Sequence, residues 1–202
     1  MRGLAMNAGN AMKLAVLAPA FALAGCVSLG SEPPDRLLNL TAEASAPAGA
    51  VMSGTRESAL AVHEPQVPAE IDVLRVPVRV TGTELAYVED AVWVEKPARL
   101  FRRLLAETIR ARGDTLVIDG DDPSLFTENH LRGTLRTFGY DVGSASVVVR
   151  YDAIKQGPGG TVETRRFEAT ETGFPVEAEP VGDALNRAAN EVARQVADWL
   201  AE

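Results

Sequence analysis

The sequence predicts an α/β (α+β mixed) domain, a single mixed β-sheet packed with two main helices, which follows an N-terminal signal peptide. Three observations predict it. Amphipathic helical patterns lie near residues 97–112 and 181–200, three strand patterns lie between them, and the first 25 residues differ in composition from the rest. Of the 202 residues, 46% are hydrophobic and 24% are charged, which is enough for one domain with its own core.

The first 25 residues have the pattern of an export signal. Arg2 and Lys13 are the only charged residues before Cys26, and residues 14–23 (LAVLAPAFAL) have no charged or strongly polar side chain. This run is too short to span a hydrocarbon core, which needs roughly 20 apolar residues in a helix. A basic start, a short apolar run and small residues predict a secretory signal. The start of translation stays open among Met1, Met6 and Met12.

The end of that signal, Leu23-Ala24-Gly25-Cys26, resembles the lipobox of bacterial lipoproteins. A thiol can be alkylated to a stable thioether with diacylglycerol, and after cleavage the amino group of Cys26 can also be acylated. One acyl chain holds a protein only marginally, whereas two or more hold it stably. We therefore predict that Cys26 is a membrane attachment point, with these covalent lipids and no other cofactor. The alternative is plain secretory cleavage after Ala24.

The residues after Cys26 indicate which membrane the lipoprotein is sorted to. Val27 and Ser28 follow Cys26, and no aspartate stands there. By resemblance to Gram-negative sorting rules, this favours the outer membrane over the inner. No later segment approaches 18 apolar residues, so we expect the rest of the chain to lie in the periplasm.

The mature chain is expected to begin with a tether and a variable region. Residues 26–34 form the lipidated tether, and residues 35–202 form the domain. A first strand is expected at Arg36–Leu40. Residues 42–68 are rich in Ala, Pro, Gly and Ser, a composition that predicts a long surface loop.

Residues 71–80 (IDVLRVPVRV) alternate between apolar and polar side chains, which predicts a half-buried strand. Pro77 cannot donate a ladder hydrogen bond, so this strand lies at an edge or contains a bulge. The residues expected on the buried face are Leu74, Val76, Val78 and Val80. Two short strands are expected at 84–87 and 91–94, separated by the acidic Glu89-Asp90.

The remaining elements follow from periodicity and turn residues. Pro97 suits the first turn of a helix that ends at Arg112-Gly113, where the glycine suits a C-cap. A short buried strand is expected at 115–118, then a meander over about 131–140, 145–155 and 161–170. The final helix runs from about 181 to 200. The residues expected on its apolar face are Leu185, Ala188, Val192, Val196 and Trp199.

Composition excludes several functional classes. The formal charge is −8, and removing residues 1–25 leaves 18 basic and 28 acidic residues, a net charge of −10. Nucleic-acid binding needs a basic surface, so we expect no nucleic-acid partner. The single cysteine excludes an intramolecular disulfide, and two histidines cannot supply a histidine-rich metal site.

The search for a catalytic site finds no motif for nucleophilic or metal-dependent hydrolysis. We interpret His63 as solvated and His130 as a residue at the start of a strand. Residues 157–160 (GPGG) predict a hairpin turn rather than a phosphate-binding loop, since no Lys-Ser/Thr follows. The acidic residues of 119–123 predict a solvated turn rather than a calcium site. We therefore expect no catalytic residues, no metal and no enzymatic activity.

The polar face of the first helix is basic. We interpret it as a solvated face with one ion pair, Arg103 with Glu107, or as a contact for acidic lipid head groups or an acidic partner. The arginines concerned are Arg99, Arg102, Arg103 and Arg110. Two aromatic residues just before this helix, Tyr87 and Trp93, are expected to anchor the core.

These features together resemble the ABC-type transport auxiliary lipoprotein family. The resemblance rests on the lipobox, on "ELAYVEDAVWVEKPARLFRRLLAETIRARG" with its stretch from Tyr87 to Trp93, and on the closing "DALNRAANEVARQVADWL". It covers roughly residues 35–201. One departure is that the aromatic pair usual in the family's first strand is replaced by Leu37-Leu38.

The resemblance implies a role rather than a reaction. Such lipoproteins accompany mammalian-cell-entry-type (MCE) transport systems, in which a permease and an ATPase work with an MCE-domain substrate-binding protein that moves lipids between membranes. It also implies that a homo-oligomer can form. Two alternatives stay open: a stand-alone structural envelope lipoprotein, and a lipoprotein hydrolase, which would need a buried polar cluster.

Overall fold

One mixed sheet of seven strands and two α-helices make up the described part of the computed structural model, residues 36–119 and 126–202. The predicted fold class is confirmed, and the predicted signal peptide lies outside the described residues. In chain order the elements are η1 (Arg56–Ser58), β1 (Leu60–Val62), β2 (Arg75–Arg79), β3 (Leu85–Val92), α1 (Pro97–Arg112), β4 (Val117–Asp119), β5 (Asn129–Asp141), β6 (Ser146–Gln156), η2 (Pro158–Gly160), β7 (Val162–Thr172) and α2 (Ala178–Leu200).

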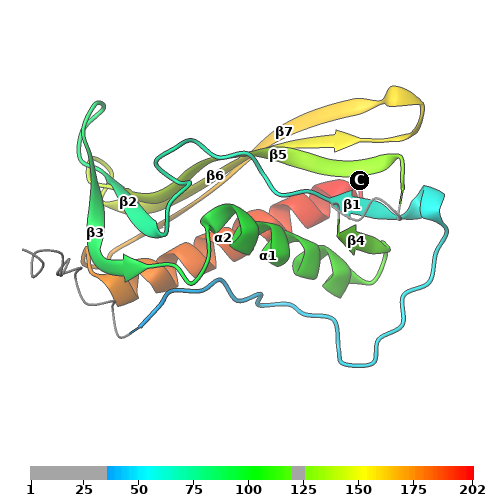
Figure 1. Ribbon diagram of the computed structural model, residues 1–202, viewed down its shortest axis with the longest axis horizontal. Coiled ribbons are helices and arrows are strands. Elements are labelled where there is room, and N and C mark those ends of the chain that lie inside the picture. The colour runs from blue at the N-terminus through cyan, green and yellow to red at the C-terminus, as the bar shows by residue number, and fades with distance from the viewer. Residues whose placement is uncertain (1–35, 120–125) are drawn as a thin grey trace, which may run out of the picture. The chain divides into compact units, whose positions relative to one another are not determined.

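The sheet is organised around the long strand β5. One edge of β5 pairs antiparallel with β6, which in turn pairs antiparallel with β7, so the predicted meander is confirmed. The other edge pairs in parallel with two short strands, β1 near the start of β5 and β2 near its end. Beyond them lie β4, parallel to β1, and β3, antiparallel to β2 (Figure 1).

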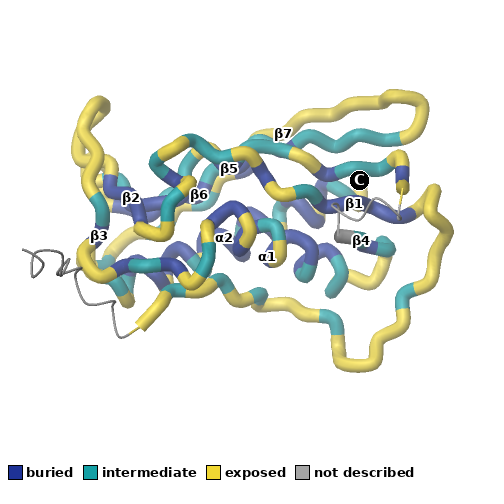
Figure 2. Tube along the Cα trace, in the orientation of Figure 1, coloured by how far each residue is buried: buried dark blue, intermediate teal, exposed yellow. Residues whose placement is uncertain are grey.

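Both helices pack on the same face of the sheet and against each other (Figure 1). α1 begins at Pro97, as predicted, and ends at Gly113, which takes the left-handed conformation with φ 80°. The predicted apolar faces of both helices are buried, and Figure 2 shows the buried residues concentrated where helices and strands meet. Aromatic contacts join the two layers, with ring centroids of Phe101 and Tyr151 5.3 Å apart and those of Phe167 and Trp199 5.6 Å apart.

The two aromatic residues expected to anchor the core differ in their surroundings. Trp93 is 1% exposed and packs on Phe138, with ring centroids 5.4 Å apart, as predicted. Tyr87 is only half-buried, and the guanidinium of Arg75 lies 3.9 Å from its ring centroid. Tyr87 therefore contributes a cation–π contact on β2 and β3 more than core volume.

A segment before the first strand is fixed along the helices. Asn190 of α2, 5% exposed, accepts a hydrogen bond from the Glu43 amide (2.9 Å) and donates one to the Thr41 carbonyl (2.9 Å). Asn186 accepts from the Thr41 amide at 2.8 Å. Glu107 of α1 accepts from the Ala46 amide at 2.9 Å. We call residues 38–46 the strap, because side chains of both helices hold its backbone.

Two predictions about the region before β2 need correction. The expected first strand, Arg36–Leu40, forms only an isolated bridge between Leu38 and Trp93. The predicted long loop 42–68 contains η1 and β1, and β1 is buried between β5 and β4 in the sheet. Three apolar residues are too few to show a strand period, so the sequence pattern could not reveal β1.

The strand predicted over 71–80 is shorter than expected. β2 spans Arg75–Arg79, and the outer residues Leu74 and Val80 are 44% and 36% exposed rather than buried. β2 lies between β3 and β5, and its register shifts between Arg75 and Pro77. Of the two interpretations of Pro77, the edge position is therefore wrong, and the register shift beside Pro77 agrees with the bulge.

The two short strands expected around Glu89-Asp90 are one strand, β3. Asp90 has φ 55°, so the chain passes through the left-handed region inside the strand. Aspartate tolerates this conformation better than most residues. What looks in the sequence like a break is a local irregularity in a continuous strand.

Candidate functional site

The predicted attachment site lies outside the described residues. Leu23, Ala24, Gly25 and Cys26 all precede Arg36, where the described chain begins, so lipidation of Cys26 stays a prediction. In the described part of the chain, neither helix is long and apolar enough to cross a membrane.

The arginines predicted on α1 are where the sequence placed them, but glutamates neutralise most of them. Arg99 pairs with Glu64 and with Glu95, each at 3.4 Å, and Arg103 also pairs with Glu95. Glu107 pairs with Arg110 at 3.0 Å, not with Arg103 as expected from their spacing.

Arg102 is half-buried on the same helix, while Arg99 and Arg103 are more than half exposed. Exposed ion pairs of this kind contribute little to stability, about 0–1 kcal/mol each. An acidic partner on this face would therefore have to compete with Glu95 and Glu107, at a modest energetic cost.

The two histidines, 67 positions apart in the chain, meet in the structure. Nε2 of His63 and Nδ1 of His130 lie 2.9 Å apart, and their ring centroids are 5.1 Å apart. His63 follows β1 and His130 lies on β5, so the parallel pairing of these strands brings the rings together. Desolvation by burial, helped by the charge of Arg132, lowers the pKa of His130, which favours the neutral ring that this hydrogen bond needs. The interpretation of His63 as a solvated residue is therefore corrected.

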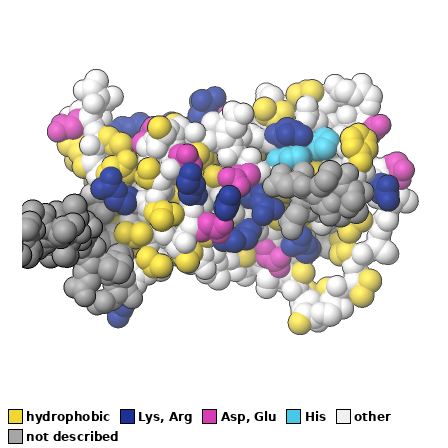
Figure 3. Space-filling model, in the orientation of Figure 1, with side chains coloured by type: hydrophobic (Ala, Val, Ile, Leu, Met, Phe, Trp, Pro, Cys, Tyr) yellow, Lys and Arg dark blue, Asp and Glu magenta, His cyan; other side chains and the backbone are white. Residues whose placement is uncertain are grey.

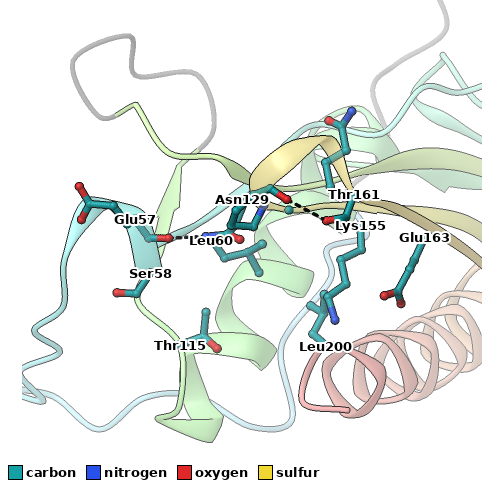
Figure 4. A pocket seen from close by; sticks show the side chains of 12 residues that line it. Glu57, Ser58, Leu60, Thr115, Asn129, Lys155, Thr161, Glu163 and Leu200 are labelled. Carbon is teal, nitrogen blue, oxygen red and sulfur yellow. Dashed lines mark hydrogen bonds between the residues drawn. The ribbon is translucent and has the colours of Figure 1, made fainter.

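A pocket of about 440 Å³ opens at the end of the domain where β6 and β7 turn (Figure 4). Figure 4 shows Lys155 reaching toward Leu200 at the end of α2, with Glu163 on the neighbouring strand. Asn129 donates to the Glu57 carbonyl at 2.6 Å and so holds η1 against β5 on the pocket wall. The pocket offers one ammonium (Lys155), two carboxylates (Glu57 and Glu163) and several hydroxyls, so it suits a small polar molecule.

The GPGG segment beside this pocket is a hairpin turn, as predicted. The Gly157 amide donates to the Thr161 carbonyl at 3.0 Å, and Gly159 and Gly160 take φ of 69° and 77°. Positive φ at two successive positions explains why glycine stands at both. The turn joins β6 and β7 through the three-residue η2 alone, with no α-helix between them whose N-terminus could bind a phosphate.

The sheet face that lies away from the helices carries a network of ion pairs. Asp152 of β6 accepts hydrogen bonds from Arg136 (2.9 Å) and Arg166 (2.6 Å) on the two neighbouring strands, and Arg150 pairs with Glu168. The hydrogen bond from Arg166, followed by that from Arg136, lowers the pKa of Asp152 to about 2. These carboxylates are therefore engaged in holding the strands together.

Metal-ligating side chains do not gather in the described ranges, 36–119 and 126–202. No group of three or more His, Cys, Asp or Glu residues there is placed to hold a metal ion. Asp121 and Asp122 lie outside the described residues, so the solvated turn expected there stays a prediction.

Solved structures share this arrangement of strands and helices. The protein XCC0632 from Xanthomonas campestris is similar with a TM-score of 0.69 and 17% identity, covering 82% of this chain and 94% of that one. An uncharacterized protein is similar with a TM-score of 0.54 and 14% identity, covering 72% and 96%. At these identities the likeness concerns the fold alone. None of the curated proteins matches this chain.

A family model matches most of the domain. It describes the ABC-type transport auxiliary lipoprotein component and covers residues 39–197, from the strap to the last turn of α2. The match includes β1 to β7 and α1, the elements from which the sheet and its helical layer are built. The chain belongs to the ABC-type transport auxiliary lipoprotein family.

Proposed function

We propose that this chain is the non-catalytic auxiliary lipoprotein of an MCE-type ABC transport system that moves lipids between the inner and outer membranes. The observation that carries the proposal is the family match over residues 39–197 behind a Leu-Ala-Gly-Cys sequence. The proposed partner is the MCE-domain substrate-binding protein, with its permease and ATPase. ATP would be hydrolysed by the partner.

The anchor in this proposal is Cys26. A diacylglyceryl thioether together with an N-acyl group supplies two or more chains, which is what stable attachment requires. The residues after Cys26 favour the outer membrane by the sorting rules. The domain would then stand in the periplasm on a tether of nine residues, 26–34.

The described side chains support a binding module rather than an enzyme. Most charged groups with shifted pKa values are tied into ion pairs, between neighbouring strands for Asp152 with Arg166 and within α2 for Glu191 with Arg194. Arrangements of this kind stabilise a surface. Catalytic acids and bases are instead poised to exchange a proton with a substrate.

Partner capture tests the transport role. The lipidated protein with a C-terminal affinity tag is purified from detergent-solubilised envelope, and the co-purifying proteins are identified by mass spectrometry. Cys26→Ala removes the anchor, and Ser28→Ala is the matched control that leaves the lipobox intact. The native size of the purified complex reports whether several copies assemble.

The proposal predicts that the wild type and Ser28→Ala recover an MCE-domain protein with its permease and ATPase, and that Cys26→Ala recovers much less. Recovery of only peptidoglycan or unrelated outer-membrane proteins would contradict it. That outcome would favour a stand-alone structural envelope lipoprotein.

A further inference from the structure

Three exposed apolar residues lie on adjoining segments where the described chain begins. Leu37, Leu74 and Val94 are 53%, 44% and 51% exposed. Backbone hydrogen bonds bring their segments together: the Val94 amide donates to the Leu38 carbonyl (2.9 Å), and the Trp93 amide donates to the Leu74 carbonyl (2.6 Å). We call these three residues the junction patch. Figure 3 shows hydrophobic side chains gathered at this end of the domain, over β2 and β3.

The charges around the junction patch balance. Lys96 pairs with Asp72 at 2.9 Å, and Arg36 pairs with Glu179 at 3.7 Å. All four side chains are about half exposed or more, so long basic side chains stand beside apolar ones. An acidic or a basic protein would find little net charge to bind here. An apolar surface bordered by paired charges instead suits zwitterionic lipid head groups above an acyl layer.

The junction patch lies only a short distance along the chain from Cys26, the predicted lipid attachment point. Arg36 stands ten residues after Cys26, and ten residues fully extended span at most about 36 Å. The strap begins at Leu38 and is fixed to α2 by Asn186 and Asn190, so the tether cannot lengthen unless those hydrogen bonds break. A lipid on Cys26 therefore keeps Arg36 within about 36 Å of the membrane.

We propose that the junction patch lies against the lipid surface that holds the acyl chains of Cys26. This inference rests on the lipid anchor of the proposed function and adds an orientation to it. The β6–β7 turn, near the other end of the 13-residue strand β5, then points away from the membrane. At about 3.3 Å per residue, β5 separates the two ends by roughly 40 Å.

Site-directed spin labelling tests the orientation. Cys26 is the only cysteine of the chain, and a thioether leaves it without a free thiol, so a cysteine introduced elsewhere is the only labelling site. Leu37→Cys and Val94→Cys probe the junction patch. Val162→Cys, 58% exposed at the start of β7, is the matched control. The lipidated proteins are placed in phosphatidylcholine–phosphatidylethanolamine vesicles, and collisions of the nitroxide with O₂ and with a water-soluble nickel complex are compared.

We expect vesicles to raise the ratio of O₂ to nickel collisions at positions 37 and 94 and to leave it unchanged at 162. Equal ratios at all three positions on vesicle-bound protein would overturn the orientation and leave the anchor standing. Failure of the wild type to bind vesicles would overturn the anchor and the orientation together. All three positions are exposed, so the substitutions leave the core intact, and a urea titration of each variant checks this.

Discussion

Gly133 on β5 shows how closely a backbone and an aromatic ring approach in the core. A Cβ atom at this position would overlap the Asp152 carbonyl oxygen and lie 2.7 Å from the Tyr151 ring. Tyr151 is fully buried, its hydroxyl donates to the Arg132 carbonyl at 2.9 Å, and burial raises its pKa. Neither neighbour can move without breaking a strand contact, so only glycine fits here.

Gly133→Ala is therefore expected to lower the free energy of unfolding by about 1–3 kcal/mol, the range for overpacking a core. Gly82→Ala is the control, because no atom lies within 4 Å of its Cβ position, and it should change the free energy by less than about 0.5 kcal/mol. Urea titration followed by circular dichroism measures both. Equal stability of the two variants would show that β5 and β6 are not packed as described.

Asp152 makes the stability of the sheet depend on pH. Its pKa falls from the ordinary value near 3.8 to about 2 in the folded protein, because Arg166 and Arg136 bind the carboxylate. A depressed folded-state pKa contributes stability above the unfolded pKa, and this contribution disappears as the pH falls through the folded value.

Asp152→Asn should accordingly be less stable than wild type at pH 7, and the difference should shrink between about pH 4 and pH 2. Unfolding by urea at a series of pH values measures the difference, and Asp183→Asn, on the exposed face of α2, is the control. A difference that stays constant down to pH 2 would mean that the ionised carboxylate is not the stabilising group.

At the residue scale, the sequence predicts which side chains are buried better than it predicts which residues they contact. Both Trp93 and Tyr87 are expected in the core as large aromatic residues, and the structure buries Trp93 but leaves Tyr87 half-buried. The contact between His63 and His130 could not be anticipated, because it depends on the parallel register of β1 with β5, and no local pattern encodes that register. Asn190 was missed for the same reason, since its partners lie almost 150 positions away.

At the element scale, α1 is the clearest case of local encoding. Proline at its first position, an apolar stripe and a glycine after its last residue fixed both ends correctly. β1 is the opposite case, because three residues in an Ala/Pro/Gly-rich region become a strand only through pairing with β4 and β5. A strand that forms only by pairing with distant segments leaves no periodic pattern in its own sequence, so periodicity cannot predict it.

The end of α1 provides a test of its cap. Gly113 has φ 80°, and its amide donates to the Arg110 carbonyl at 3.1 Å. Gly113→Ala should lower the free energy of unfolding by about 1–2 kcal/mol, the usual cost of the left-handed conformation for a residue with a Cβ. No atom lies within 4 Å of the Cβ position, so the cost comes from the backbone alone.

Gly113→Asn is the matched variant, because asparagine tolerates this conformation, and it should recover part of the loss. Thermal unfolding of both variants measures the effect. If asparagine destabilises as much as alanine does, then the left-handed cap is not what makes glycine necessary.

The hydrogen bonds that hold the strap to α2 can also be tested by substitution. Asn190→Ala removes the partner of the Glu43 amide and of the Thr41 carbonyl, and leaving such groups unsatisfied costs about 1–3 kcal/mol. Hydrogen exchange should accelerate at the Glu43 amide. Arg187→Ala, on the same helix as Asn190, removes an exposed ion pair with Glu171 of β7 and is the control. Unchanged exchange at Glu43 in Asn190→Ala would contradict the proposed fixing of the strap.

At the scale of the whole molecule, the sequence predicts the class of fold but not its topology. The meander of β5 to β7 and the two helices follow from periodicity. The placement of β1 and β2 along the same edge of β5 does not, because both connections are non-local. The candidate site divides in the same way: the lipobox is visible as a local motif, whereas the junction patch exists only after Leu37, Leu74 and Val94 are brought together by folding.

Lipid on Cys26 is the claim on which the membrane location, the transport role and the orientation of the domain all depend. The intact mass of the protein purified from membranes tests it most directly. We predict a polypeptide that begins at Cys26 and carries the added mass of a diacylglyceryl group and an N-acyl chain. A chain that begins at Gly25, or one that begins at Cys26 without added lipid mass, would contradict the account.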